Sequence, residues 1–154
     1  MEIERKFLIA ALPEDLTRYP RLEIEQGYLC TDPVVRIRRQ NDDYILTYKS
    51  GGMMAREEYN LPLNEAAYAH LKEKTDGIYI SKTRYLIPCD PYTIELDVFH
   101  GDTDGLVLAE VEFGTVEEAE RFVPPAWFGT DVTYDGRYHN SYLSTHGYFS
   151  GDQR

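Results

Sequence analysis

The sequence lacks most features that mark common classes of small protein. Its two cysteines, Cys30 and Cys89, stand far apart without metal-ligand spacing, so we expect two free thiols. No run approaches the roughly 18–20 apolar residues of a membrane span. No glycine-rich loop of the P-loop type is present, so side chains must hold any bound phosphate. The opening residues are acidic and have no signal-peptide pattern, so we expect a cytoplasmic protein.

Basic residues are in the minority. The chain has 16 Lys and Arg against 27 Asp and Glu, giving a formal charge of −11 at pH 7. Such a chain repels nucleic acid in bulk and favours metal cations. We therefore expect neither a nucleic-acid nor a membrane partner, and a monomer or homodimer that acts on a small molecule.

Hydrophobic residues make up 42% of the 154 residues and aromatic residues 13%, which is a globular composition. We expect one domain over residues 1–154. The dominant hydrophobic period is two, which predicts strands. Eight strands are expected, at 2–9, 22–29, 34–40, 44–50, 56–62, 78–87, 92–99 and 106–113.

Short turns join most of these runs, so the sheet should be largely antiparallel. Eight antiparallel strands can close into a barrel and so remove their exposed edges. Helices are expected at 64–74 behind an Asn64 cap, at 115–122 behind a capping box, and at 138–146. The segment 124–129 is expected to be irregular. The predicted fold class is α+β, mainly β: an eight-stranded antiparallel closed barrel with a few peripheral helices.

The first strand carries an unusual charged face. Glu2, Glu4 and Lys6 share one side. Ile3, Phe7 and Ile9 form an apolar side, which Arg5 interrupts. A single stripe of this kind is usually a solvated outer face. Six later strands repeat the pattern, however, and the charges separate by sign from strand to strand. Like charges two residues apart on one strand repel each other, so stability alone does not select them.

A closed barrel with its charges turned inward accounts for the set. Seven acids would line it: Glu2, Glu4, Glu58, Glu95, Asp97, Glu110 and Glu112. Six bases would join them: Lys6, Arg36, Arg38, Lys49, Lys82 and Arg84. Such an interior must be hydrated and hold ligands, because unpaired buried charge is costly.

The chemistry of the ligand follows from the two groups of side chains. Carboxylates without His or Cys partners suit Mg²⁺ or Mn²⁺, and clustered Arg and Lys suit a polyanion with several phosphate oxygens. A divalent metal between carboxylates and a polyphosphate satisfies both groups. The pattern therefore indicates phosphoryl-transfer chemistry.

The ordered motifs also resemble a known family. E-x-E-x-K at residues 2–6 is followed by R-I-R (36–38), T-Y-K (47–49), R-E-E-Y (56–59), K-T-R-Y (82–85), E-L-D (95–97) and E-V-E-F (110–113). In this order they resemble the CYTH superfamily, the triphosphate tunnel metalloenzymes, over roughly residues 2–140. The resemblance implies an eight-stranded antiparallel tunnel, a triphosphate-containing substrate and a divalent metal.

The resemblance also implies roles for individual residues. The implied metal ligands are Glu2, Glu4, Asp97, Glu110 and Glu112. The implied phosphate clamp is Lys6, Arg36, Arg38, Lys49, Lys82 and Arg84. Glu58 and Glu95 would hold a second metal or orient a base, and Arg137 would either close the tunnel or be an exposed arginine. Glu4, Lys6 and Arg38 are the candidate catalytic residues.

Several activities fit this family. We favour hydrolysis of inorganic triphosphate to pyrophosphate and phosphate, because three phosphates and a metal account for the charged positions and no extra base pocket is evident. The alternatives are a class IV-type adenylate cyclase, a nucleoside or thiamine triphosphatase, and a non-catalytic polyphosphate or nucleotide binder.

Overall fold

The computed structural model describes residues 1–148 and consists mainly of antiparallel strands. The strands are β1 (Glu2–Ile9), β2 (Arg21–Thr31), β3 (Val34–Gln40), β4 (Asp43–Lys49), β5 (Ala55–Arg56), β6 (Glu58–Leu63), β7 (Asp76–Cys89), β8 (Tyr92–His100), β9 (Val107–Glu112) and β10 (Phe128–Asp131). The helices are α1 (Glu65–Lys72), α2 (Val116–Arg121) and α3 (Asn140–His146), with 3₁₀ turns at Leu16–Arg18, Gly101–Thr103 and Gly136–Tyr138. None of these helices is long and apolar enough to cross a membrane.

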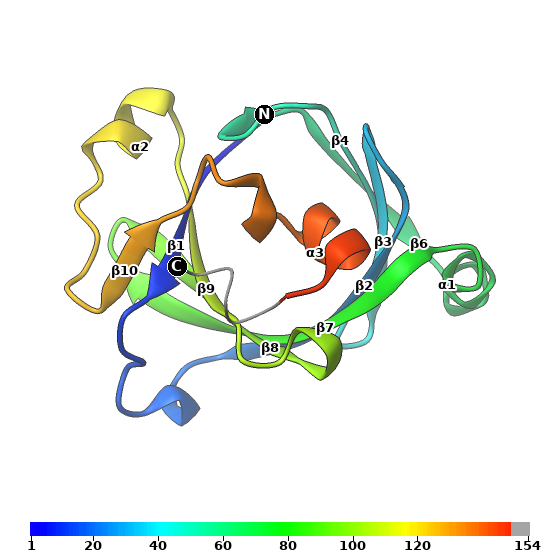
Figure 1. Cartoon of the computed structure of the whole chain (residues 1–154), viewed down its shortest axis with the longest axis horizontal. Helices are drawn as coiled ribbons and strands as arrows, with labels where there is room; N and C mark the ends of the chain where they lie inside the picture. Colours follow the sequence, from blue (N-terminus) through cyan, green and yellow to red (C-terminus); the bar gives the residue numbers. More distant parts are fainter. Residues whose placement is uncertain (149–154) are drawn as a thin grey trace.

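The strands curl into a nearly closed barrel, so the expected mainly β barrel is confirmed (Figure 1). Their order is β10-β1-β9-β8-β7-β2-β3-β4-β6, and β5 pairs with β1. The closing contact is short: Glu2 faces Arg56 and Ile3 faces Ala55. A two-residue ladder between β1 and β5 therefore forms the seam that closes the barrel.

The number of strands differs from the eight expected. The run expected at 56–62 splits at Glu57 into β5 and β6, because the chain leaves β1 there and joins β4. Both backbone groups of Glu57 bond to Ser50 across this bend. The prediction of an irregular 124–129 was wrong at its end, where Phe128 begins β10 and pairs with Ile9. This four-residue strand is too short to show a hydrophobic period.

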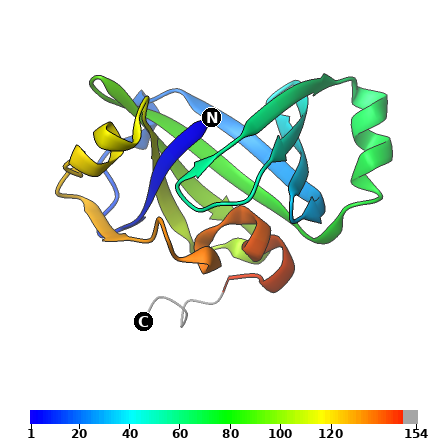
Figure 2. The same ribbon diagram turned by 90° about the horizontal axis from the view of Figure 1, so that it is seen from above.

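The expected helix caps are in place. The Asn64 side chain accepts a hydrogen bond from the Ala67 amide, and the Thr115 side chain accepts one from the Glu118 amide. The helices α1 and α2 lie on opposite sides of the barrel, and α3 lies across one end (Figures 1 and 2). The outer face of the barrel near α2 buries an apolar cluster that includes Phe7, Leu96 and Val111.

A second apolar cluster lies at the α3 end of the barrel. Ile80, Phe99 and Leu108 belong to it, and they continue the inward face that carries the charged residues of β7, β8 and β9. Tyr138 and Leu143 from the C-terminal segment pack on them. The inner face therefore changes from charged to apolar along the barrel, and only part of the interior is polar.

Arg5 explains the interruption of the apolar face of β1. Its guanidinium donates to the carbonyl oxygens of Ala119 and Phe122 at 2.8 and 3.1 Å, at the end of α2, and to an Asp131 carboxylate oxygen at 2.9 Å. It also lies 4.9 Å from the ring centre of Phe7. One side chain thus ties β1, α2 and β10 together.

The substitution Arg5→Met should lower the free energy of unfolding by roughly 1–3 kcal/mol, because the two helix carbonyls lose their donor. Urea denaturation measures the loss. Arg5→Lys keeps the positive charge but lacks the fork that bonds the two carbonyls through one nitrogen and Asp131 through the other, so it should lose less than Arg5→Met. An Arg5→Met protein as stable as the wild type would contradict this role.

Candidate active site

The polar part of the barrel interior encloses a cavity of about 320 Å³. Charged and polar side chains from opposite walls line it: Glu2, Glu4, Lys6, Arg36, Arg38, Gln40, Thr47, Lys49, Arg56, Glu58, Asn60, Arg84, Glu95, Glu110, Glu112, His139, Asn140 and Ser141. Most of the charges predicted to point inward therefore meet in one cavity. Several are almost completely buried, including Lys6 at 4% and Glu110 at 6% relative exposure.

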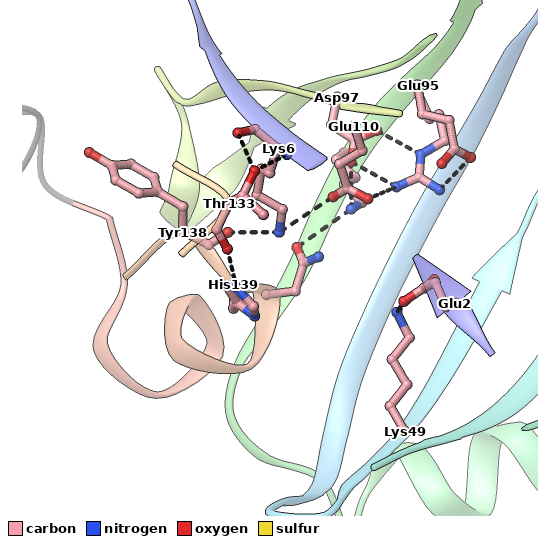
Figure 3. Close-up of polar contacts among 12 residues, drawn as sticks. Glu2, Lys6, Lys49, Glu95, Asp97, Glu110, Thr133, Tyr138 and His139 are labelled. Carbon is pink, nitrogen blue, oxygen red and sulfur yellow. Dashed lines mark hydrogen bonds and ion pairs between the residues drawn. The ribbon is translucent and has the colours of Figure 1, made fainter. Parts of the chain in front are cut away.

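One wall of the cavity, from β3 and β4, is basic. Arg36, Arg38 and Lys49 are buried there. The Lys49 ammonium lies 2.9 Å from a Glu2 carboxylate oxygen (Figure 3). It also lies 3.6 Å from a Glu58 carboxylate oxygen. The Lys49–Glu2 pair spans from β4 to β1, which are not hydrogen-bonded to each other. Side chains thus bridge the seam that the short β5–β1 ladder closes.

The other wall, from β1, β8 and β9, is rich in carboxylates. Glu4 faces Glu112 directly across the β1–β9 ladder, and Lys6 faces Glu110. The Lys6 ammonium is 3.5 Å from Glu110 and donates to the Tyr138 carbonyl at 3.1 Å. Burial opposes ionisation of Glu110, but Lys6 and the other nearby cations outweigh it and hold its pKa well below the usual range.

Glu4 is in a different electrostatic position from Glu110. Burial and the negative charges of Glu110 and Glu2 raise the pKa of Glu4 to about 8. Like charges directly opposite each other, as Glu4 and Glu112 are, destabilise a sheet. A divalent cation at this wall would relieve both effects.

The donor set therefore fits a hard cation such as Mg²⁺ or Mn²⁺. Within residues 1–148, no three carboxylate, imidazole or thiol groups converge closely enough to form a ready-made metal cage. Mg²⁺ is commonly held by one or two carboxylates together with water and substrate phosphates, and this arrangement suits that mode.

Two predicted site residues lie behind the wall. Lys82 and Asp97 are fully buried and do not line the cavity. Their side chains form an ion pair of 2.7 Å, and Arg84 donates twice to Asp97, at 2.7 and 2.9 Å. Arg84 itself faces the cavity and also bonds Glu95 at 3.0 Å. In this structure Asp97 holds Arg84 and Lys82 and is not open to a metal, and Lys82 is not open to a phosphate.

The remaining predicted residues lie near the edge of the site. Glu112 is exposed, while Glu58 and Glu95 are half-buried, and all three line the cavity. Arg137 bonds Asp135 through two nitrogens, at 3.0 and 2.7 Å, and is not among the described residues that line the cavity. Its placement matches the exposed-arginine alternative and does not bring it to the cavity.

Sequence reasoning missed several lining residues. Gln40 continues the Arg36–Arg38 alternation and Asn60 continues that of Glu58, so period two could have found both. His139, Asn140 and Ser141 had no such signal, because they follow a 3₁₀ turn and do not lie on a strand. Burial and the cations Lys6 and Arg56 lower the pKa of His139 to about 4, so its ring is neutral at pH 7.

Comparison with known proteins identifies the family. The CYTH domain family matches residues 1–126, which is most of the chain. The chain belongs to the CYTH family. Among curated proteins it is 42% identical over 149 residues to an inorganic triphosphatase of Nitrosomonas europaea, covering 93% of this chain and 96% of the relative. It is 37% identical to an inorganic triphosphatase of Acetivibrio thermocellus, covering 96% and 95%.

Solved structures agree on the fold. The crystal structure of the inorganic triphosphatase NE1496 matches with a TM-score of 0.70 and 38% identity, covering 94% of each chain. A putative adenylyl cyclase from Hippeastrum, described as having a dominant triphosphatase activity, matches with a TM-score of 0.59 at 14% identity over 78% of this chain and 83% of that one. This second likeness concerns the fold alone. Solved structures with different activity names thus share this barrel fold.

The raised pKa of Glu4 predicts a pH-dependent stability of the metal-free protein. The folded pKa of about 8 lies above the ordinary 4.5, so the fold favours the protonated carboxyl. The protonated Glu4 carboxyl makes its full contribution to the free energy of unfolding below pH 4.5, and this contribution is lost as pH rises through about 8. Relative to wild type, Glu4→Gln should therefore gain free energy of unfolding between about pH 5 and about pH 9.

Urea denaturation in a chelator measures this difference, and comparison with Glu4→Gln isolates Glu4 from the neighbouring acids. Adding Mg²⁺ at the high-pH end should restore wild-type stability and have less effect on the variant, because the cation replaces the proton. Wild-type and variant curves that run parallel across the whole pH range would rule out this role for Glu4.

Proposed function

We propose that this protein is a divalent-metal-dependent triphosphatase, and that its principal substrate is inorganic triphosphate, which it hydrolyses to pyrophosphate and phosphate. The observation that carries the proposal is the cavity itself: buried cationic side chains on one wall face clustered carboxylates on the other. Curated relatives at 42% and 37% identity over nearly the whole chain are inorganic triphosphatases, which supports the same substrate. We further propose that residues 1–154 act as a single CYTH-type domain.

Mg²⁺ or Mn²⁺ is the proposed metal, and the carboxylates of Glu2, Glu4, Glu110 and Glu112 would hold it. When bound, the ion polarises a phosphoryl oxygen and helps to position the attacking water. Glu4 is the strongest candidate of the four, because it is buried and its carboxylate makes neither a hydrogen bond nor an ion pair within the described residues. Glu110 is already paired with Lys6 and would contribute through that pair.

The cations of this chain have separate proposed tasks. Arg36, Arg38 and Lys49 bind the phosphate oxygens from one wall, and Lys6 binds them from the other. Lys6 or Arg38 also stabilises the charge that gathers on the leaving pyrophosphate. Glu58 and Glu2 flank Lys49 and hold its ammonium at the cavity before substrate arrives. Lys82 and Asp97 support Arg84 from behind the wall and do not touch the substrate.

The alternatives differ in what they need beyond the triphosphate. A cyclase needs an adenine pocket and a group that activates the ribose 3′-hydroxyl, and a thiamine triphosphatase needs aromatic surface for the thiamine rings. The cavity lining is dominated by charged and amide side chains, with Tyr28 as its aromatic member. A pure anion binder would have no use for the carboxylate wall. The cytoplasmic location and the monomeric or homodimeric state remain predictions from the sequence.

Phosphate release tests the proposal directly. The purified protein should release phosphate from tripolyphosphate faster than from ATP or thiamine triphosphate, and only with Mg²⁺ or Mn²⁺ present. Lys6→Ala should raise KM or lower kcat for tripolyphosphate by at least about tenfold, because a hydrogen-bonded charge at the phosphate is lost. Conversion of ATP to cyclic AMP and pyrophosphate as the only turnover would overturn the proposal.

Glu4→Gln supplies the matched control for the metal role. The variant keeps the size of the side chain but removes its charge, so turnover should be lost while the far-ultraviolet spectrum and the barrel persist. Wild-type activity in Glu4→Gln would remove Glu4 from the metal site. Binding of tripolyphosphate by the wild type without any phosphate release would favour the non-catalytic alternative.

A further inference from the structure

Four arginines line the cavity, and the three buried ones, Arg36, Arg38 and Arg84, are held by different kinds of partner. Arg84 is held by carboxylates: Asp97 accepts from two of its nitrogens and Glu95 from a third. Its positive charge is thereby compensated inside the protein. Arg36 and Arg38 lie on one face of β3, two residues apart, and neither has an ion pair with a carboxylate within residues 1–148.

The partner of Arg38 is a neutral amide. Gln26 faces Arg38 across the β2–β3 ladder, and its Oε1 accepts from the Arg38 Nε at 2.8 Å. A guanidinium only donates, so the amide oxygen and not its nitrogen must face it. Gln26 is fully buried, and its Nε2 has no hydrogen-bond partner in the described part of the chain. An unpaired buried donor is costly, so this position is not optimised for stability alone.

The partner of Arg36 is also neutral. Thr47 faces Arg36 across the β3–β4 ladder, and its hydroxyl oxygen accepts from an Arg36 terminal nitrogen at 3.2 Å. The same hydroxyl donates to the Asn60 Oδ1 at 2.6 Å, which turns its lone pairs toward Arg36. Asn60 in turn donates to Glu58 at 2.8 Å. Within the described residues, the Arg36 guanidinium donates no other side-chain hydrogen bond, and its Nε has no partner, so Thr47 is the group that orients it.

A neutral acceptor and a carboxylate have different effects on an arginine. Both fix the plane of the guanidinium, which two-point recognition of phosphate oxygens requires. A carboxylate also cancels the charge, whereas an amide or hydroxyl leaves it available to a ligand. Burial and the neighbouring Arg36 and Arg84 lower the pKa of Arg38 to about 9, so it remains protonated at neutral pH beside another uncompensated cation.

We infer that Gln26 and Thr47 are positioning residues that fix the Arg38 and Arg36 guanidinium groups for phosphate binding without neutralising them. The inference rests on the proposed function, because it assigns both arginines to a polyphosphate. It adds two uncharged residues to the determinants of polyanion specificity. Gln26 lies outside the cavity lining and Thr47 is part of it, and each acts through the arginine that it holds.

The substitution Gln26→Glu tests the need for a neutral partner. It keeps the size of the side chain and an acceptor for Arg38, but adds the negative charge that a neutral partner avoids. Calorimetric titration with tripolyphosphate in a chelator, where no turnover occurs, should show the dissociation constant rising at least about tenfold, while the melting temperature stays the same or rises. A merely structural glutamine would predict unchanged binding.

Gln40→Glu is the matched charge control. Gln40 lies on β3 two residues from Arg38 and lines the same cavity, but makes no hydrogen bond to a guanidinium within residues 1–148. The same added charge there should weaken binding less than in Gln26→Glu. Equal weakening in the two variants would mean that only the overall charge of the cavity matters, and would overturn the inference.

A second pair of variants tests orientation at the other arginine. Thr47→Val keeps the shape of the side chain and removes its hydroxyl, so tripolyphosphate binding should weaken by about tenfold, and Thr47→Ser should restore it. Wild-type binding by Thr47→Val would overturn the inference. The wild type could bind tripolyphosphate, and the variants could weaken or restore that binding as stated, while no phosphate is released. In that case the positioning roles stand and the proposed triphosphatase activity fails.

Discussion

The cost of burying charge inside a closed sheet governs the rest of this structure. A barrel with apolar side chains outside and charged side chains inside is tolerated only if each charge has a partner or a ligand. The protein meets this requirement unevenly. Where the interior is driest, Lys82 and Arg84 share the Asp97 carboxylate, and Glu95 supplies the second negative charge that Arg84 needs. In the cavity the compensation is left incomplete, since Glu4 lacks a cation and Arg36 and Arg38 lack an anion.

The register of the ladders creates these partnerships. Arg84 faces Asp97, Arg38 faces Gln26, Arg36 faces Thr47 and Lys49 faces Glu58, each across one pair of neighbouring strands. Glu4 instead faces Glu112, a pairing that is unfavourable until a cation arrives. Binding of a metal and a polyphosphate would thus satisfy the charges that the ladders leave unmatched. This division between matched and unmatched pairs separates supporting residues from those that meet ligands.

The alternation of side chains along the strands was sufficient to predict much of the fold and of the charged cavity. It identified the barrel and the charges that point inward, because period two fixes the face of each residue in a strand. It did not show which residues face each other, since register depends on the turns and on packing across strands. For that reason Lys82 and Asp97 were assigned to ligands, although they bind each other. Gln26 gave no signal, because its face of β2 carries Ile24 and Tyr28 and no charge, and Thr47 stood in the T-Y-K motif without a role of its own.

The C-terminal segment could not be predicted in the same way. Directly after β10, Val132 and Thr133 bond the backbone of Lys6. Farther along the segment, the Tyr138 carbonyl accepts a hydrogen bond from the Lys6 ammonium. These contacts join residues more than 120 positions apart and follow no local period. Val132, Thr133 and Tyr138 lie beyond the residues matched to the CYTH family, yet they hold Lys6, the lysine of the E-x-E-x-K motif, in place. The active cavity is therefore completed from outside the matched region.

The central claim is that the two walls bind opposite ends of one metal–polyphosphate ligand. A crystal structure of the wild-type protein with Mn²⁺ and a non-hydrolysable analogue of tripolyphosphate, in which the anomalous signal locates the metal, tests it most directly. We expect the metal in direct contact with a carboxylate oxygen on the β1–β9 wall, bridged by phosphate oxygens to Arg36, Arg38 and Lys49. A triphosphate bound outside the barrel, or a metal bound away from that wall, would contradict the claim.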